Sequence, residues 1–140
     1  MKKYLIMLMI AMMVFPLSAK SPKQIAAEVK TTIIENLEAS NMQNMEQTLK
    51  TIHTQSMAYM QTKMQISKIY DNWKLKIDLL NFEFIGMTGD YAVARFRQKT
   101  VKLSGPAFNN NISDALAVFK QENGKWKFWS QCQLAVEFIK

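Results

Sequence analysis

Cysteine, histidine, glycine and proline are all scarce in this sequence of 140 residues, with counts of one, one, four and three. The lone Cys132 excludes a disulfide within the chain, so stability has to come from a packed apolar core, and we expect Cys132 to lie in that core. An intersubunit disulfide or a reactive thiol is the alternative. Since His53 is the only histidine, and glycine-rich phosphate loops, paired zinc-ligand spacings and calcium-binding loops are also missing, we expect neither a metal nor a cofactor.

Long apolar runs are equally scarce, and the one that occurs covers residues 4–15. It follows Lys2 and Lys3 and precedes Pro-Leu-Ser-Ala at residues 16–19, an order typical of a secretory signal. A membrane-spanning helix needs about 20 apolar residues, so an uncleaved anchor is the weaker alternative. We expect residues 1–19 to be a signal peptide cleaved near Ala19.

The exported part should therefore be one periplasmic or secreted domain, residues 20–140, with no stable membrane span. Loss of the two lysines of the signal lowers the formal net charge from +7 to +5. The remaining positive residues are scattered along the chain rather than grouped, which does not favour a nucleic-acid partner.

Helical signals dominate the first half of this domain. Apolar residues recur every fourth position over residues 21–39, after a Ser-Pro pair suited to a helix start. A break at residues 40–41 precedes a second short apolar stripe that ends at residue 52. A short extended piece is predicted for residues 57–61, and a third short helix for residues 63–70.

The second half alternates with a period of two, which predicts strands over residues 73–79, 91–103, 112–121 and 126–138. Gly86, Gly89 and Asp90 supply turn chemistry after the first of these strands. Asn-Gly at residues 123–124 predicts a hairpin, because a type I′ turn needs a positive φ at both central residues. Helices followed by consecutive strands predict an α+β fold with a bent antiparallel sheet over the helices.

This order of elements, GDYAVAR at residues 89–95 and NGKWK at residues 123–127 resemble the nuclear transport factor 2-like superfamily, from residue 25 to the C-terminus. The resemblance implies a cone-shaped, cystatin-like roll with the helices in the concave face of a strongly bent sheet. It also implies a cavity between helix and sheet, and often dimerisation through the outer face of the sheet. Ketosteroid isomerase-like members use a carboxylate base after the second helix, but residues 54–60 contain no Asp or Glu.

Two assignments of the faces of strand 91–103 remain open. In one, the alanines and Phe96 turn inward and the basic residues face solvent. In the other, Arg95 and Arg97 look into the cavity together with Tyr91. The similar association domain of calcium/calmodulin-dependent kinase favours the second, since an arginine at the place of Arg97 lines the pocket there. A guanidinium in a partly dry pocket is a natural ligand for a carboxylate.

The last hairpin supplies the other pocket candidates. Pairing of Phe119 with Phe128 and of Ala117 with Ser130 would leave an apolar wall and some space, as expected of a small-ligand pocket, although ordinary core packing gives the same pattern. In full, the candidate pocket residues are Arg97, Arg95, Tyr91, Tyr59, Tyr70, His53, Trp126, Phe128 and Ser130. Leu116, Val118 and Trp129 would share the opposite face, which indicates a candidate homodimer interface.

From these features we expect an exported, dimeric domain that binds a small anionic or apolar molecule without catalysing a reaction. One alternative is a divergent isomerase- or cyclase-like enzyme in which His53, Tyr59 or Tyr70 replaces the missing carboxylate. A structural role at a helix end is the competing interpretation of His53. Another alternative is an interaction module whose cavity is filled by its own side chains. The superfamily contains all of these classes, so the fold alone does not decide between them.

Overall fold

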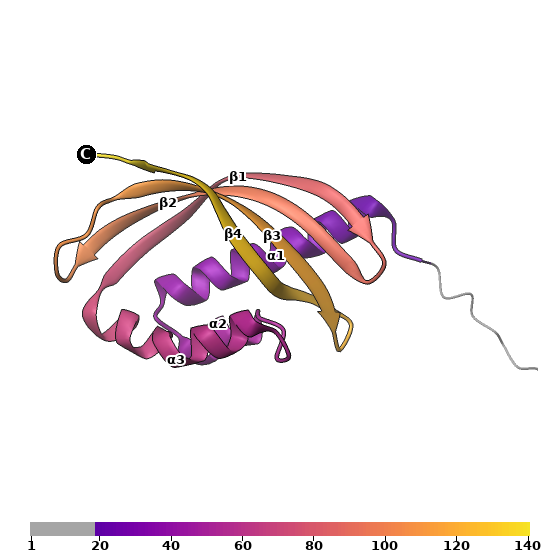
Figure 1. Ribbon diagram of the computed structural model, residues 1–140, viewed down its shortest axis with the longest axis horizontal. Coiled ribbons are helices and arrows are strands. Elements are labelled where there is room, and N and C mark those ends of the chain that lie inside the picture. Colours follow the sequence, from indigo (N-terminus) through magenta and orange to yellow (C-terminus); the bar gives the residue numbers. More distant parts are fainter. Residues whose placement is uncertain (1–18) are drawn as a thin grey trace, which may run out of the picture.

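The computed structural model describes residues 19–140, which form three helices followed by four strands. The helices are α1 (Pro22–Asn41), α2 (Met45–Lys50) and α3 (Met57–Asn72). The strands are β1 (Lys74–Thr88), β2 (Tyr91–Ser104), β3 (Asn111–Glu122) and β4 (Lys125–Phe138). They form one antiparallel sheet in the order β1-β2-β3-β4, and the sheet arches over α1 (Figure 1). The predicted α+β roll is thereby confirmed, whereas the expected signal peptide lies, apart from Ala19, outside the described residues.

α1 begins as predicted. The Ser21 hydroxyl accepts a hydrogen bond from the backbone N–H of Gln24, and the Gln24 side chain accepts one from the backbone N–H of Ser21. This reciprocal capping box satisfies two amide groups that the first turn leaves free. The helix ends at Asn41, two residues later than expected, because Gln43 takes the left-handed φ of 54° and Asn44 then caps α2.

The segment predicted to be extended is instead the first turn of α3. The buried Ser56 caps this helix by accepting a hydrogen bond from the backbone N–H of Tyr59. The prediction was wrong because Ile66 is the only buried residue of α3. A helix with so few buried side chains lacks the continuous apolar stripe that reveals a 3.6-residue period in a sequence. The helix predicted for residues 63–70 is confirmed and forms the rest of α3.

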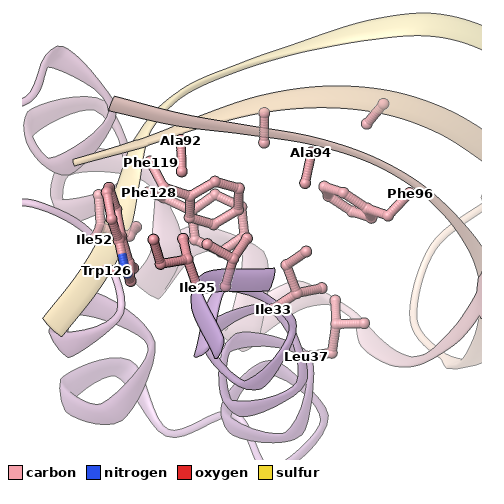
Figure 2. Packing of buried hydrophobic residues seen from close by; sticks show 13 residues of the cluster. Ile25, Ile33, Leu37, Ile52, Ala92, Ala94, Phe96, Phe119, Trp126 and Phe128 are labelled. Carbon is pink, nitrogen blue, oxygen red and sulfur yellow. The ribbon is translucent and has the colours of Figure 1, made fainter. Parts of the chain in front are cut away.

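The core lies between α1 and the concave face of the sheet (Figure 2). α1 contributes Ile25, Val29, Ile33 and Leu37, and the sheet contributes Ala92, Ala94, Phe96, Ala115, Ala117, Phe119, Trp126 and Phe128. The four residues of α1 are those of the predicted apolar stripe. The packing of the helix on the sheet therefore follows from the spacing of apolar residues in the helix and in the strands.

The two faces of β2 are the reverse of those needed for Arg95 and Arg97 to bind an anion in the cavity. Phe96 is only 2% exposed, whereas Arg95 and Arg97 lie exposed on the outer face of the sheet. The expectation that Arg97 faces the cavity is therefore wrong. Two guanidinium groups under α1 would need buried partners, whereas the opposite side of β2 offers an apolar surface to the core. On the outer face Arg95 makes a two-pronged contact with Asp114 of β3.

Register shifts interrupt the pairing of β1 with β2 and of β3 with β4, and two of them change what the sequence predicted. β1 continues through Gly86, which lies at an irregularity in the pairing with β2 rather than in a turn. In the last hairpin Asn123 and Gly124 have the predicted positive φ values of 53° and 75°. An extra residue on β4 then pairs Ser130 with Val118 instead of the expected Ala117. Such bulges bend a strand and raise its local twist.

The C-terminal half of β4 forms a free edge of the sheet. Every residue from Ser130 to Phe138 is exposed, although the strand is still hydrogen-bonded to β3 along its other edge. Cys132 belongs to this stretch and is exposed, so the expectation of a buried cysteine is wrong. Cys132 is exposed because the helices cover only the N-terminal half of β4.

Gly105 follows β2 with a φ of +117°, and a Cβ atom there would overlap the carbonyl oxygen of Asn72 and touch Trp73. We expect Gly105→Ala to lower the free energy of unfolding by about 1–3 kcal/mol, measured by chemical denaturation. Gly89→Ala is the matched control, since Gly89 has a φ of +59° but open space around its Cβ position. It should cost only the backbone strain of about 1 kcal/mol. Equal losses in the two variants would contradict the close packing of Gly105.

Candidate functional site

A cleft of about 540 Å³ opens between α3, the C-terminal half of α1 and the sheet. Its apolar wall is formed by Ile52, Ile66, Ile69, Trp73, Ile77 and Phe128. Its polar groups are amides and hydroxyls, among them Asn36, Gln43, Thr48, Gln61, Gln65 and Tyr70. None of the lining residues carries a charge. The cleft therefore offers an apolar surface and neutral hydrogen-bonding groups.

Some of the polar groups form a fixed frame. The Gln43 side chain donates to the carbonyl oxygens of Tyr70 and Trp73, at 2.7 and 3.0 Å, and so satisfies acceptors at the end of α3. The hydroxyls of Thr48 and Tyr70 lie 2.9 Å apart and share a hydrogen bond. The side-chain amide of Asn36 donates to Thr51. These bonds shape the cleft without a ligand.

A second group of polar side chains is free to meet a ligand. Gln61, Thr62, Gln65 and Gln131 line the cleft, and none of the side-chain hydrogen bonds within residues 19–140 involves them. A glutamine amide both donates and accepts, so these groups can bind either kind of polar atom.

The structure brings together only part of the predicted pocket. Tyr70, Phe128 and Ser130 line the cleft, and so does Trp129, which the sequence had assigned to a dimer interface. Tyr91, Arg95 and Arg97 lie on the outer face, Tyr59 packs against the core, and Trp126 lies buried near the hairpin tip. The free glutamines of α3 were missed because that part of the chain was not recognised as one helix.

His53 lies behind the cleft wall, only 5% exposed. Its backbone N–H donates to the carbonyl of Phe128, and its Nδ1 accepts a hydrogen bond from the backbone N–H of Gln55. A ring nitrogen that accepts a hydrogen bond carries no proton, so the 3.6 Å approach of Glu122 to Nδ1 is not a charged pair. His53 joins the α2–α3 connection to β4, and it does not line the cleft.

Trp129 packs against its own chain. Its ring meets His53 edge to face, with ring centres 5.0 Å apart, and Tyr91 at 6.0 Å. The ammonium group of Lys120 lies 4.7 Å from the ring centre. Leu116 and Val118 are half-buried on the same outer face. These neighbours account for the partial burial of Trp129, so homodimerisation stays a prediction, and a monomer in sedimentation at high micromolar concentration would contradict it.

Glu122 is the main charged group near His53, and its side chain is 15% exposed. Burial raises its pKa, but hydrogen bonds from Lys127 and from the hydroxyl and backbone N–H of Thr54 outweigh this and lower the pKa to about 2. Since the ordinary value is 4.5, the carboxylate contributes stability above that pH and loses it as the pH falls towards 2.

We expect Glu122→Gln to lower the free energy of unfolding by about 1–3 kcal/mol at pH 7, the range for hydrogen bonds to charged groups. The difference from the wild type should shrink between pH 4.5 and pH 2, where the wild-type carboxylate takes up its proton. Denaturant titrations at several pH values measure this. Asp90→Asn is the control, because the exposed Asp90 lies 3.7 Å from Lys120 and should change stability by less than about 1 kcal/mol. A loss that is independent of pH would contradict the assignment.

No helix within residues 19–140 is long and apolar enough to cross a membrane. Over the same range, no three residues of the types His, Cys, Asp and Glu lie close enough together to hold a metal ion.

Comparison with known proteins gives a family and a fold. Residues 31–139 match the family model described as the C-terminal domain of the anti-sigma-I factor RsgI9. No curated protein sequence matches the chain.

Several solved structures are similar in fold. A proposed aromatic ring hydroxylase from Novosphingobium aromaticivorans has a TM-score of 0.68 at 12% identity, over 86% of this chain and 96% of that chain. A proposed dehydratase of the nuclear transport factor 2-like family from Streptomyces avermitilis has a TM-score of 0.65 at 16% identity, over 79% and 95%. The beta subunit of benzoate 1,2-dioxygenase from Burkholderia mallei has a TM-score of 0.62 at 10% identity, over 76% and 87%. At such identities the likeness concerns the fold alone.

Proposed function

This chain belongs to the RsgI9 C-terminal domain family and has the nuclear transport factor 2-like fold, and we propose that it is an exported, non-catalytic domain that binds a small uncharged molecule in the cleft between α1, α3 and the sheet. The observation that carries the proposal is a cleft of about 540 Å³ with an apolar wall and only uncharged polar groups. That volume falls within the range of roughly 300–1,000 Å³ found for small-molecule sites.

The lack of charge in the lining favours a neutral ligand over the anion expected from the sequence. Moving a charged group from water into a site without a counter-charge costs several kcal/mol. The arginines that could have met an anion, Arg95 and Arg97, lie on the outer face of the sheet. An apolar body can pack on Trp73 and Phe128, while the free glutamines at Gln61 and Gln65 can bind its polar groups.

Binding is better supported than the two alternatives. A divergent isomerase needs a base in the cleft, but its lining residues include no carboxylate or imidazole, and the Tyr70 hydroxyl already shares a hydrogen bond with Thr48. A pure interaction module would fill its cavity with its own side chains, whereas this cleft is open. RsgI9 is by its name an anti-sigma factor, and we propose a regulatory role for this chain as well, with the bound small molecule as its signal.

Mass spectrometry of the chain purified from the envelope of its own host tests export and binding together. The denatured mass should be that of a chain starting near Lys20, because the apolar run of the signal is too short to anchor it. The native mass should exceed the denatured mass by one neutral small molecule. A denatured mass that includes Met1 would contradict export, and equal native and denatured masses would count against binding.

A matched pair of variants locates the ligand. Gln65 lines the cleft from α3, whereas Ser67 is exposed on the same helix and does not line it. We expect Gln65→Trp to weaken binding of the uncharged dye Nile red at least tenfold, because the indole would fill part of the cleft. Ser67→Trp should bind like the wild type. Unchanged binding by Gln65→Trp, or tighter binding of an anionic dye such as anilinonaphthalene sulfonate, would reject the proposed site.

A further inference from the structure

The methionines of the described residues take no part in the core. All six, Met42, Met45, Met57, Met60, Met64 and Met87, are at least 45% exposed. Methionine is usually among the buried residue types, and here Ile, Val, Phe, Trp and Ala supply the core instead. The placement of the methionines therefore needs an explanation other than packing.

Three of them form a narrow row on α3. Met57, Met60 and Met64 follow one another at spacings of three and four residues and are 67%, 58% and 72% exposed. At about 100° per residue they fall within an arc of about 60° on the helix surface. Ile66, the only buried residue of α3, lies on roughly the opposite side. The row, which we call the thioether stripe, thus faces solvent, with Met57 also reaching the rim of the cleft.

We propose that the thioether stripe binds one soft monovalent metal ion, Cu(I), for which Ag(I) is a close chemical stand-in. Thioether sulfur is a soft ligand that selects Cu(I) among the biological metals. Met57 and Met64 are about 10 Å apart along the helix axis, so an ion above Met60 is about 5 Å along the axis from each of them. Methionine has three rotatable bonds and adapts easily, so all three sulfurs can turn towards one ion.

The composition of the stripe favours a metal over a protein partner. Helices that dock into apolar grooves usually present leucine, isoleucine or aromatic anchors at this spacing, and the stripe has sulfur at all three positions. Hard ions such as Ca²⁺ and Mg²⁺ prefer oxygen ligands, which the three stripe side chains do not offer. Lys63 and Lys68 lie three and four residues after Met60 and Met64, so a bound cation meets some repulsion, but both lysines are exposed and solvent weakens it.

The test is a titration of the full chain with silver nitrate in chloride-free buffer, followed through the methyl NMR signals of its methionines. All samples carry Cys132→Ser, because the exposed thiol would compete for the metal. Assigned signals are needed, since residues 1–18 contain further methionines. We expect the signals of Met57, Met60 and Met64 to move together and to saturate with one equivalent of Ag(I), before that of Met87 responds. Cu(I), kept reduced by ascorbate under argon, should move the same signals.

Leucine variants separate sulfur chemistry from apolar docking, because leucine keeps the apolar surface and nearly the same volume. Met60→Leu should weaken Ag(I) binding at least tenfold, and the triple variant Met57→Leu, Met60→Leu, Met64→Leu should take up one equivalent fewer than its parent. Met87→Leu is the control and should match the parent at the stripe. Uptake by the triple variant equal to that of the parent, or movement of the Met87 signal at the same metal concentration as the stripe, would overturn the proposal.

Discussion

The connection between α1 and α2 holds the cleft together. The side chain of Asn41 exchanges two hydrogen bonds with the backbone of Ile77 in β1, at 2.7 and 2.8 Å, and so ties the end of α1 to the sheet. Two residues later the left-handed Gln43 reaches the carbonyls of Tyr70 and Trp73. One short segment thereby fixes the end of α1, the end of α3 and the start of β1. Since these groups are half-buried, losing either amide would leave acceptors without donors.

α3 depends on such bonds because its apolar anchorage is small, with Ile66 buried and with Ala58 and Tyr59 only partly buried against the core. Ser56 and Gln43 hold its two ends, the hydroxyl of Tyr70 is bonded to Thr48, and Ile66 is its only buried side chain. A helix with a broad apolar stripe would sink against the sheet and fill the space beneath it. Held mainly by polar contacts along one side and at its ends, α3 stands off and leaves the cleft open.

The same property decides what could be predicted from the sequence. The apolar periods of α1 and of the strands specify the core, the hairpin at Asn123 and the general fold, because those residues make the core contacts. Only residues 63–70 of α3 were predicted to be helical, because its N-terminal part is capped by Ser56 and has no buried apolar residue that would mark a helical period. In β2 the alternation of residue types defines two faces, but it does not say whether the face with Phe96 or the face with Arg97 is buried. The bulge that displaces Ser130 leaves no mark in composition.

The cleft side of α3 mixes apolar and polar groups. Ala58, Ile66 and Ile69 line the cleft beside Gln61 and Gln65, while Met57, Met60 and Met64 are more than half exposed. An ordinary surface helix keeps its apolar groups inward and its polar groups outward. On α3 the amides at the cleft and the exposed thioethers add nothing to the core, and these are the positions on which the proposed binding rests.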